Sequence, residues 1–310
     1  MGNEIPLFEN GSVVINDLTP LADGESSDGN TPKATESGIV ALADDPLVNY
    51  DPDKKNLSIG PETKIPEKTT TPDGSVEDTA NAVAIGSDGT TAALNSVAIG
   101  KQARAEAQGT IAIGRDARAQ GAYSMALGRE SRANGDSSIA IGKEAWATKQ
   151  GTVALGTEAH STEDRSVSIG DGALSSGIQG VAVGPASQAL SADSVAFGSS
   201  SKAEGVEATA LGPSSLAKGK ESLAVGNGAE AHWNSDSAVG HNAHAEGGAA
   251  AAFGFEAHAD ASKAIAIGNA AFNDMEPSYS SLEYGSKIKN VKNFKKRRSH
   301  VNQKNTLKHD

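Results

Sequence analysis

Basic side chains recur every fourteen residues in the first half of the chain, in two series. One series consists of Lys101, Arg115, Arg129 and Lys143; the other consists of Arg104, Arg118 and Arg132, continued by Trp146 and His160. If each segment of fourteen residues forms one turn of a stacked structure, like residues come within about 5 Å of each other. The candidate residues for binding an anionic receptor are therefore Lys101, Arg104, Arg115, Arg118, Arg129, Arg132 and Trp146, whose ring could stack on a sugar.

Acidic residues recur beside the first basic series, at Asp116, Glu130 and Glu144. Stacked like charges are mildly destabilising, and these carboxylates would offset that repulsion. The basic series are then either a face for anionic glycans or lipopolysaccharide phosphates, or a solvated ladder balanced by its acids. The interleaved acids favour the ladder.

Histidines also recur at this spacing, at His244 and His258, with His241 close by in the sequence. Stacked imidazoles can bind metal ions. No carboxylate recurs at a ligand spacing, so we expect exposed imidazoles, and neither a metal site nor a cofactor.

Motifs of common enzymes are absent from the sequence. It contains no Walker A, no G-x-S-x-G and no H-E-x-x-H motif, and no calcium-binding G-G-x-G-x-D repeat. Parallel coils also occur in acyltransferases with a six-residue repeat, and that period is missing here. We predict that the protein is not an enzyme.

The elements that position these side chains follow from an unbroken glycine repeat. The glycines are Gly86, Gly100, Gly114, Gly128, Gly142, Gly156, Gly170, Gly184, Gly198, Gly212, Gly226, Gly240, Gly254 and Gly268. An apolar–Ala–apolar triplet precedes nearly every glycine, and small residues return three and five positions after most of them, as at Ala103 and Ala105. Each unit therefore predicts two short strands with alternating faces, joined by tight turns at the glycines.

The resulting fold class is all-β, a parallel β-roll (a solenoid) of fourteen turns, about 65 Å long at the usual strand spacing. Because Val or Ile and Ala point to opposite faces of the same strand, either set could line the interior of the roll. The other set would remain as a long apolar stripe, which closed self-association would cover. We therefore expect an oligomer, and threefold symmetry suits a fibre.

The units Ser96–Gly100 (SVAIG), Ser138–Gly142 (SIAIG) and Ser194–Gly198 (SVAFG), with the small residues that follow, resemble the YadA-like head repeat. This family comprises trimeric autotransporter adhesins and some phage fibres. The resemblance covers residues 80–273 and implies a left-handed parallel β-roll in which three chains pack around an axis. It thus implies a homotrimer.

Two segments flank the repeat array: residues 1–79, a polar attachment segment or linker, and residues 274–310, a basic tail. Lys33–Ala43 resembles a short module of phage tail-fibre proteins, and a β-turn in a linker is the alternative interpretation. The part from Lys287 onward carries a net charge of +8, which leaves −20 on the remainder. The strongly negative charge of the chain before Lys287 argues against nucleic-acid binding.

These features predict a trimeric fibre that attaches to a host surface. We find neither a signal peptide nor a stretch of eighteen apolar residues that would predict a membrane span. The expected role is a virion appendage on the virion surface, held by other virion proteins through residues 1–79 and binding a host glycan or protein. A bacterial surface adhesin and a structural spacer without a receptor are the alternatives.

Overall fold

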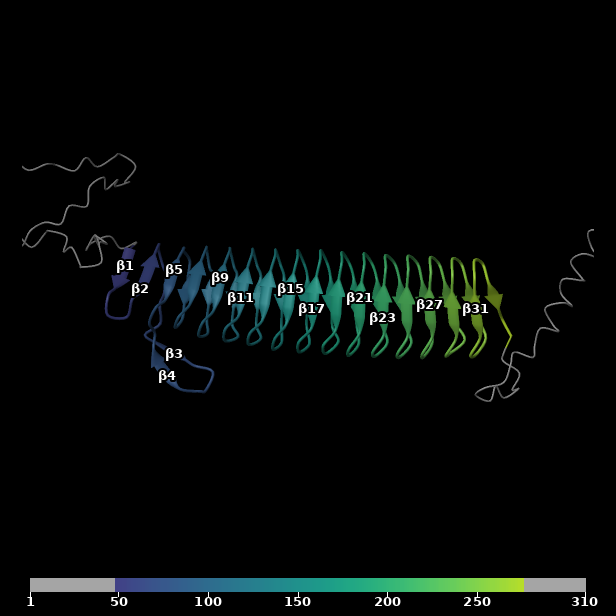
Figure 1. Ribbon diagram of the computed structural model, residues 1–310. Coiled ribbons are helices and arrows are strands. Elements are labelled where there is room, and N and C mark those ends of the chain that lie inside the picture. The colour runs from purple at the N-terminus through teal and green to yellow at the C-terminus, as the bar shows by residue number, and fades with distance from the viewer. Residues whose placement is uncertain (1–47, 276–310) are drawn as a thin grey trace, which may run out of the picture.

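A computed structural model describes residues 48–275, which form one elongated β-roll (Figure 1). Within this range the chain contains strands and turns and no helix. Two sheets, parallel except at one end, face each other along the rod, and each of the fourteen repeat turns between residues 83 and 273 contributes one strand to each. The predicted fold class, an all-β parallel roll, is confirmed.

The larger sheet has sixteen strands, and most of its strands are the apolar–Ala–apolar triplets that precede the repeat glycines. In order they are β1 (Val48–Asp51), β2 (Asn56–Ile59), β5 (Val83–Ile85), β7 (Val97–Ile99), β9 (Ile111–Ile113), β11 (Met125–Leu127), β13 (Ile139–Ile141), β15 (Val153–Leu155), β17 (Val167–Ile169), β19 (Val181–Val183), β21 (Val195–Phe197), β23 (Thr209–Leu211), β25 (Leu223–Val225), β27 (Ser237–Val239), β29 (Ala251–Phe253) and β31 (Ile265–Ile267).

The smaller sheet has fourteen two-residue strands. They are β6 (Thr91–Ala92), β8 (Arg104–Ala105), β10 (Arg118–Ala119), β12 (Arg132–Ala133), β14 (Trp146–Ala147), β16 (His160–Ser161), β18 (Leu174–Ser175), β20 (Gln188–Ala189), β22 (Lys202–Ala203), β24 (Leu216–Ala217), β26 (Glu230–Ala231), β28 (His244–Ala245), β30 (His258–Ala259) and β32 (Phe272–Asn273). Residues fourteen apart pair directly from β8 onward, as Ala105 does with Ala119.

Alanine fills the interior of the roll. The central residue of the triplets, such as Ala98 or Ala140, is fully buried, and so are the alanines of the smaller sheet, such as Ala105. The flanking Val and Ile side chains point outward, in keeping with the pleat of a strand. The structure thus decides the question that the alternation leaves open: small side chains line the interior, and the larger apolar ones lie outside.

The repeat glycines lie at the turns that follow the larger sheet, as predicted. Gly100 has a φ of +126°, and a Cβ built there would lie 2.7 Å from the carbonyl oxygen of Gly114 in the next turn. From Gly86 to Gly254, each repeat glycine is therefore needed both for its backbone conformation and for the close approach of the next turn. Most turns contain two further left-handed residues, two and nine positions after the glycine, where residue types vary widely, as at Gln102 and Tyr123.

The paired strands begin upstream of residue 80, where the sequence places the start of the roll. β2 pairs in parallel with β5, so that Leu57, Ser58 and Ile59 continue the columns of the repeat. From Gly60 to Gly86 the chain takes 26 residues in place of 14. The additional residues form a hairpin of β3 (Lys68–Thr70) and β4 (Val76–Asp78), which projects from the side of the rod in Figure 1. β1 ends the larger sheet in antiparallel pairing with β2.

The module at residues 33–43 and the basic tail from residue 276 onward lie outside the described residues.

Candidate functional site

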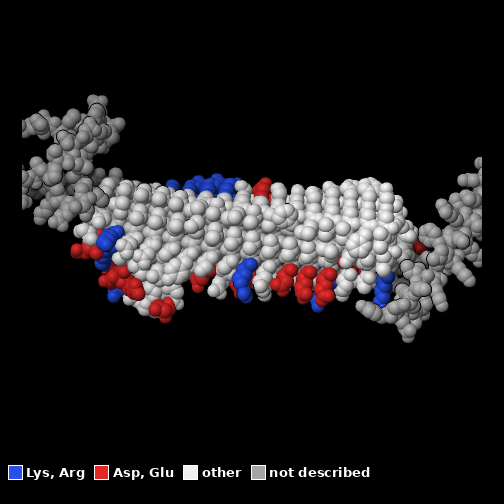
Figure 2. Space-filling view, viewed as in Figure 1, with Lys and Arg blue, Asp and Glu red and all other residues white. Residues whose placement is uncertain are grey.

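The outer face of the larger sheet is almost entirely apolar from β5 to β31, with Thr209 and Ser237 as its polar residues. The two outward positions of each triplet carry no charged residue, and several of their side chains are well exposed, among them Phe197 at 57% and Ile265 at 60%. Figure 2 shows that the face of the rod turned to the viewer is nearly free of charges, which gather along its two edges. A continuous apolar face of this size is typical of an interaction surface.

The first basic series is neutralised by neighbouring carboxylates. Lys101 Nζ lies 2.6 Å from Asp88, and the guanidinium groups of Arg115 and Arg129 lie 3.1 and 3.2 Å from Glu130 and Glu144. The hydrogen bond to Asp88 raises the pKa of Lys101. Likewise, a hydrogen bond from Lys143 is the main cause that lowers the pKa of Glu144. This series is a ladder of exposed ion pairs, each contributing little to stability.

The second basic series forms a column on the outer face of the smaller sheet. Arg104, Arg118, Arg132, Trp146 and His160 are direct partners on consecutive strands. The Arg132 guanidinium lies 5.1 Å from the centroid of the Trp146 ring, which stacks on His160 at 4.5 Å. The indole therefore lies between the guanidinium of one neighbouring turn and the imidazole of the other.

Acids compensate this second column poorly. Arg104 lies 3.7 Å from Glu106, whereas no carboxylate in residues 48–275 comes within 4.0 Å of the Arg118 or Arg132 guanidinium. We name Arg104, Arg118, Arg132 and Trp146 the arginine–tryptophan column. Of the seven candidate residues, these four form the surface on which positive charge remains available, while Lys101, Arg115 and Arg129 belong to the paired ladder.

A further cluster of titratable side chains lies beside the smaller sheet and was not predicted from the sequence. Glu230 and His232 in one turn lie beside His244 and Glu246 in the next. Looking for a carboxylate that recurs with His244 and His258 misses these residues, because their order is Glu-x-His in one turn and His-x-Glu in the next. Comparing adjacent turns position by position is the signal that finds them.

The YadA head domain repeat is the family whose model matches the chain, over residues 92–117, 119–145, 147–173, 175–201, 203–229 and 245–271. Together these matches span more than half of the 310 residues. The chain belongs to this family.

Solved structures include a similar chain, the collagen-binding domain of the Yersinia adhesin YadA. It is 25% identical, and the match covers 61% of this YadA-head protein and 83% of that chain, with a TM-score of 0.24. No curated protein matches. Membership of this family makes the chain an adhesin-type repeat protein. Between residues 48 and 275, no helix is long and apolar enough to cross a membrane.

Proposed function

We propose that the protein is a trimeric adhesin, in which three rolls pack through the apolar face of the larger sheet. The observation that carries this proposal is that a roll filled with alanine leaves its Val, Ile, Leu and Phe side chains outside. Fully burying one such side chain is worth about 1.5–3 kcal/mol, and the face repeats over fourteen turns. A closed trimer covers this face in every subunit, as the resemblance to the family implies.

Packing through the larger sheet turns the smaller sheet outward. The arginine–tryptophan column would then lie on the outside of the fibre, in three symmetric copies. Weak contacts of each copy with a repetitive surface gain avidity without any new interaction. We propose anionic glycans or lipopolysaccharide phosphates as the ligand, because no carboxylate in the described residues lies within 4.0 Å of Arg118 or Arg132. Trp146, whose ring lies between Arg132 and His160, is 38% exposed and adds an aromatic edge to this surface.

The origin of the adhesin is the finer part of this proposal. We propose a virion fibre, on the resemblance of Lys33–Ala43 to a tail-fibre module. Mass spectrometry of purified particles should detect the chain among the virion proteins. Its absence from particles, together with a gene neighbourhood for outer-membrane export, would instead support a bacterial adhesin.

Assembly is tested by placing one charge on each face of the same turn. Val167 lies on the apolar face and Leu174 on the outward face, and both are half-buried. Sedimentation should show a trimer for the parent and for Leu174→Lys, and loss of the trimer for Val167→Lys, because three buried cations would meet near the axis. A parent that sediments as a folded monomer, or a trimer that Val167→Lys leaves intact, would refute the proposed packing.

Receptor binding is tested by comparing the two basic series. The triple variant Arg104/Arg118/Arg132→Ala should lose most binding to host cells, and parental binding should weaken as salt rises. The matched control Lys101/Arg115/Arg129→Ala removes as many cations from the neutralised ladder and should bind nearly as well as the parent. If the column variant binds like the parent at both low and moderate salt, the column is only a solvated face. That result would favour the alternative of a structural spacer without a receptor.

A further inference from the structure

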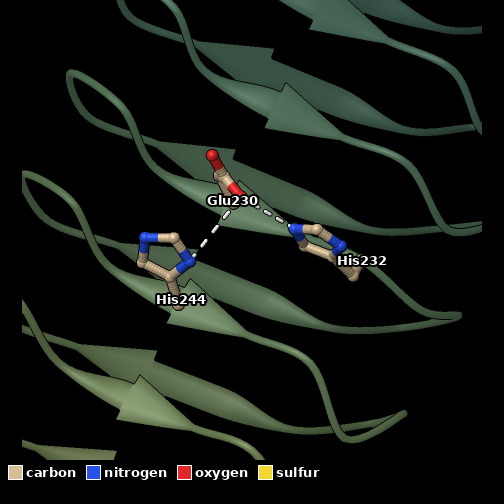
Figure 3. Close-up of side chains that lie close together, drawn as sticks. All are labelled: Glu230, His232 and His244. Carbon is tan, nitrogen blue, oxygen red and sulfur yellow. Dashed lines mark hydrogen bonds and ion pairs between the residues drawn. The ribbon is translucent and has the colours of Figure 1, made fainter.

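Two neighbouring turns bring two histidines and two glutamates together beside the smaller sheet. Glu230 and His244 are direct strand partners on β26 and β28, while His232 and Glu246 follow each of them by two positions. The two histidines therefore lie diagonally opposite each other, as do the two glutamates, and each imidazole has a carboxylate on either side. Figure 3 shows Glu230 between the two imidazole rings, with both rings turned toward its carboxylate.

The separations of these groups suit a small metal ion. Glu230 Oε2 lies 2.8 Å from His232 Nε2 and 3.6 Å from His244 Nδ1. Glu246 Oε1 lies 3.9 Å from His232 Nε2 and 4.0 Å from His244 Nδ1. Ligand atoms held at about 2.0–2.2 Å from a tetrahedral zinc ion lie about 3.3–3.6 Å from one another. The ligand atoms of Glu230, His232 and His244 all lie within 4.8 Å of one another, so small side-chain rotations would bring these three onto one ion. Glu246 lies outside this close set and would have to move further to join them.

The surroundings favour a cation over simple ion pairing. Unlike the acids of the first basic series, Glu230 and Glu246 have no Lys or Arg within 4.0 Å among residues 48–275. The two imidazoles are half-buried, with 28% and 26% of their side chains exposed. The His244 ring also stacks on His258, with centroids 4.8 Å apart and planes 2° apart, which fixes its orientation.

We propose that Glu230, His232 and His244 bind a divalent transition-metal ion of the zinc class, with Glu246 as the fourth ligand. Imidazole and carboxylate ligands without thiolates are a usual donor set for zinc. The ion would join two consecutive turns across the outer face of the roll. It would do so where the apolar columns are weakest, since Ser237 and Ala251 occupy positions that Val or Ile hold in most other turns.

Zinc titration of the chelator-treated full chain tests this site. Calorimetry should show one zinc ion per chain, and zinc should raise the melting temperature. The variant His232→Ala/His244→Ala should lose more than about 100-fold in affinity, because losing even a residue that only orients a ligand costs about 10–100-fold. No bound zinc in the parent, or unchanged affinity in this variant, would overturn the proposal.

His258→Ala is the matched control, because it removes the neighbouring histidine of the same column. It should keep one zinc ion per chain. Loss of zinc in His258→Ala equal to that in the double variant would assign the ion to the stacked His244–His258 pair and overturn the proposed ligand set. If the double variant does not fold, cobalt spectroscopy replaces it: visible bands typical of four-coordinate Co²⁺ should appear in the parent and vanish in the nearly isosteric Glu230→Gln.

Discussion

Two residues in one turn should respond in opposite ways to exchanges between glycine and alanine. Gly184 has a φ of +127°, and a Cβ built there would lie 2.7 Å from both the carbonyl carbon and the carbonyl oxygen of Gly198. Ala186, two residues later, is an exposed alanine with a φ of +54°. The first position excludes a side chain, whereas the second accepts one at a conformational cost.

The magnitudes follow from the backbone and the neighbouring turn. In Gly184→Ala, a conformation reserved for glycine costs about 1–3 kcal/mol. The contact with Gly198 adds to this, because the amide of Gly198 is held by a hydrogen bond of 2.8 Å to Val183 and cannot move away freely. We expect a total loss of about 3 kcal/mol or more. In Ala186→Gly, relief of the left-handed conformation returns about 1–2 kcal/mol. The entropy of glycine removes about 0.5–1 kcal/mol of that gain.

Denaturant unfolding at one fixed protein concentration measures both effects, since the stability of an oligomer depends on concentration. The unfolding midpoint should fall clearly for Gly184→Ala and stay level or rise slightly for Ala186→Gly. If Gly184→Ala unfolds within about 0.5 kcal/mol of the parent, the close approach of the turns is not what requires glycine. Equal destabilisation by both variants would refute the distinction between the two positions.

Two further predictions concern polar groups inside the roll. Burial raises the pKa of the Asp236 carboxyl above 3.8. Its contribution to stability is therefore complete below the pKa of the unfolded chain and is lost as pH rises through the pKa of the folded protein. The unfolding free energy of the parent relative to Asp236→Ser should decline from about pH 4 toward neutrality, and a pH-independent difference would contradict this. The buried Ser222 hydroxyl has no hydrogen-bond partner in the described structure, whereas the Ser194 hydroxyl donates to the Ser191 carbonyl at 2.6 Å. In thermal melting, Ser222→Ala should therefore be neutral or stabilising, and Ser194→Ala should be destabilising. The reverse order would show that the hydroxyl of Ser222 is satisfied.

The first turn of the roll shows how a sequence period can hide part of a structure. Leu57-Ser-Ile-Gly60 matches the repeat in its residues but not in its spacing, so the fourteen-residue period alone leaves it in the flanking segment of residues 1–79. Strand pairing depends on which backbones lie side by side, so the hairpin inserted before β5 leaves the register of β2 intact. The spacing alone does not distinguish a turn with an insertion from an isolated copy.

The two basic series illustrate a similar limit. Their common period predicts two columns, and strand pairing confirms this for Arg104, Arg118 and Arg132. Whether carboxylates neutralise a column depends on the direction in which each side chain leaves the turn. The acids one position after Arg129 and Lys143 reach Arg115 and Arg129 in the preceding turns, but in residues 48–275 no acid comes within 4.0 Å of Arg118 or Arg132.

The sequence by itself determined the repeat period, the all-β class and the positions of the turns. Glycine at a tight turn and alternating side-chain types along a strand are local backbone requirements, and both recur in every unit of the repeat. Only the tertiary structure decided what lies inside. The alternation of side chains along a strand predicts that Ala98 faces one way and its neighbours Val97 and Ile99 the other. The narrow space between the two sheets admits only the smaller side chain, so Ala98 is buried. The Glu230–His232–His244 cluster is likewise a product of stacking, because its members become neighbours only when one turn lies on the next.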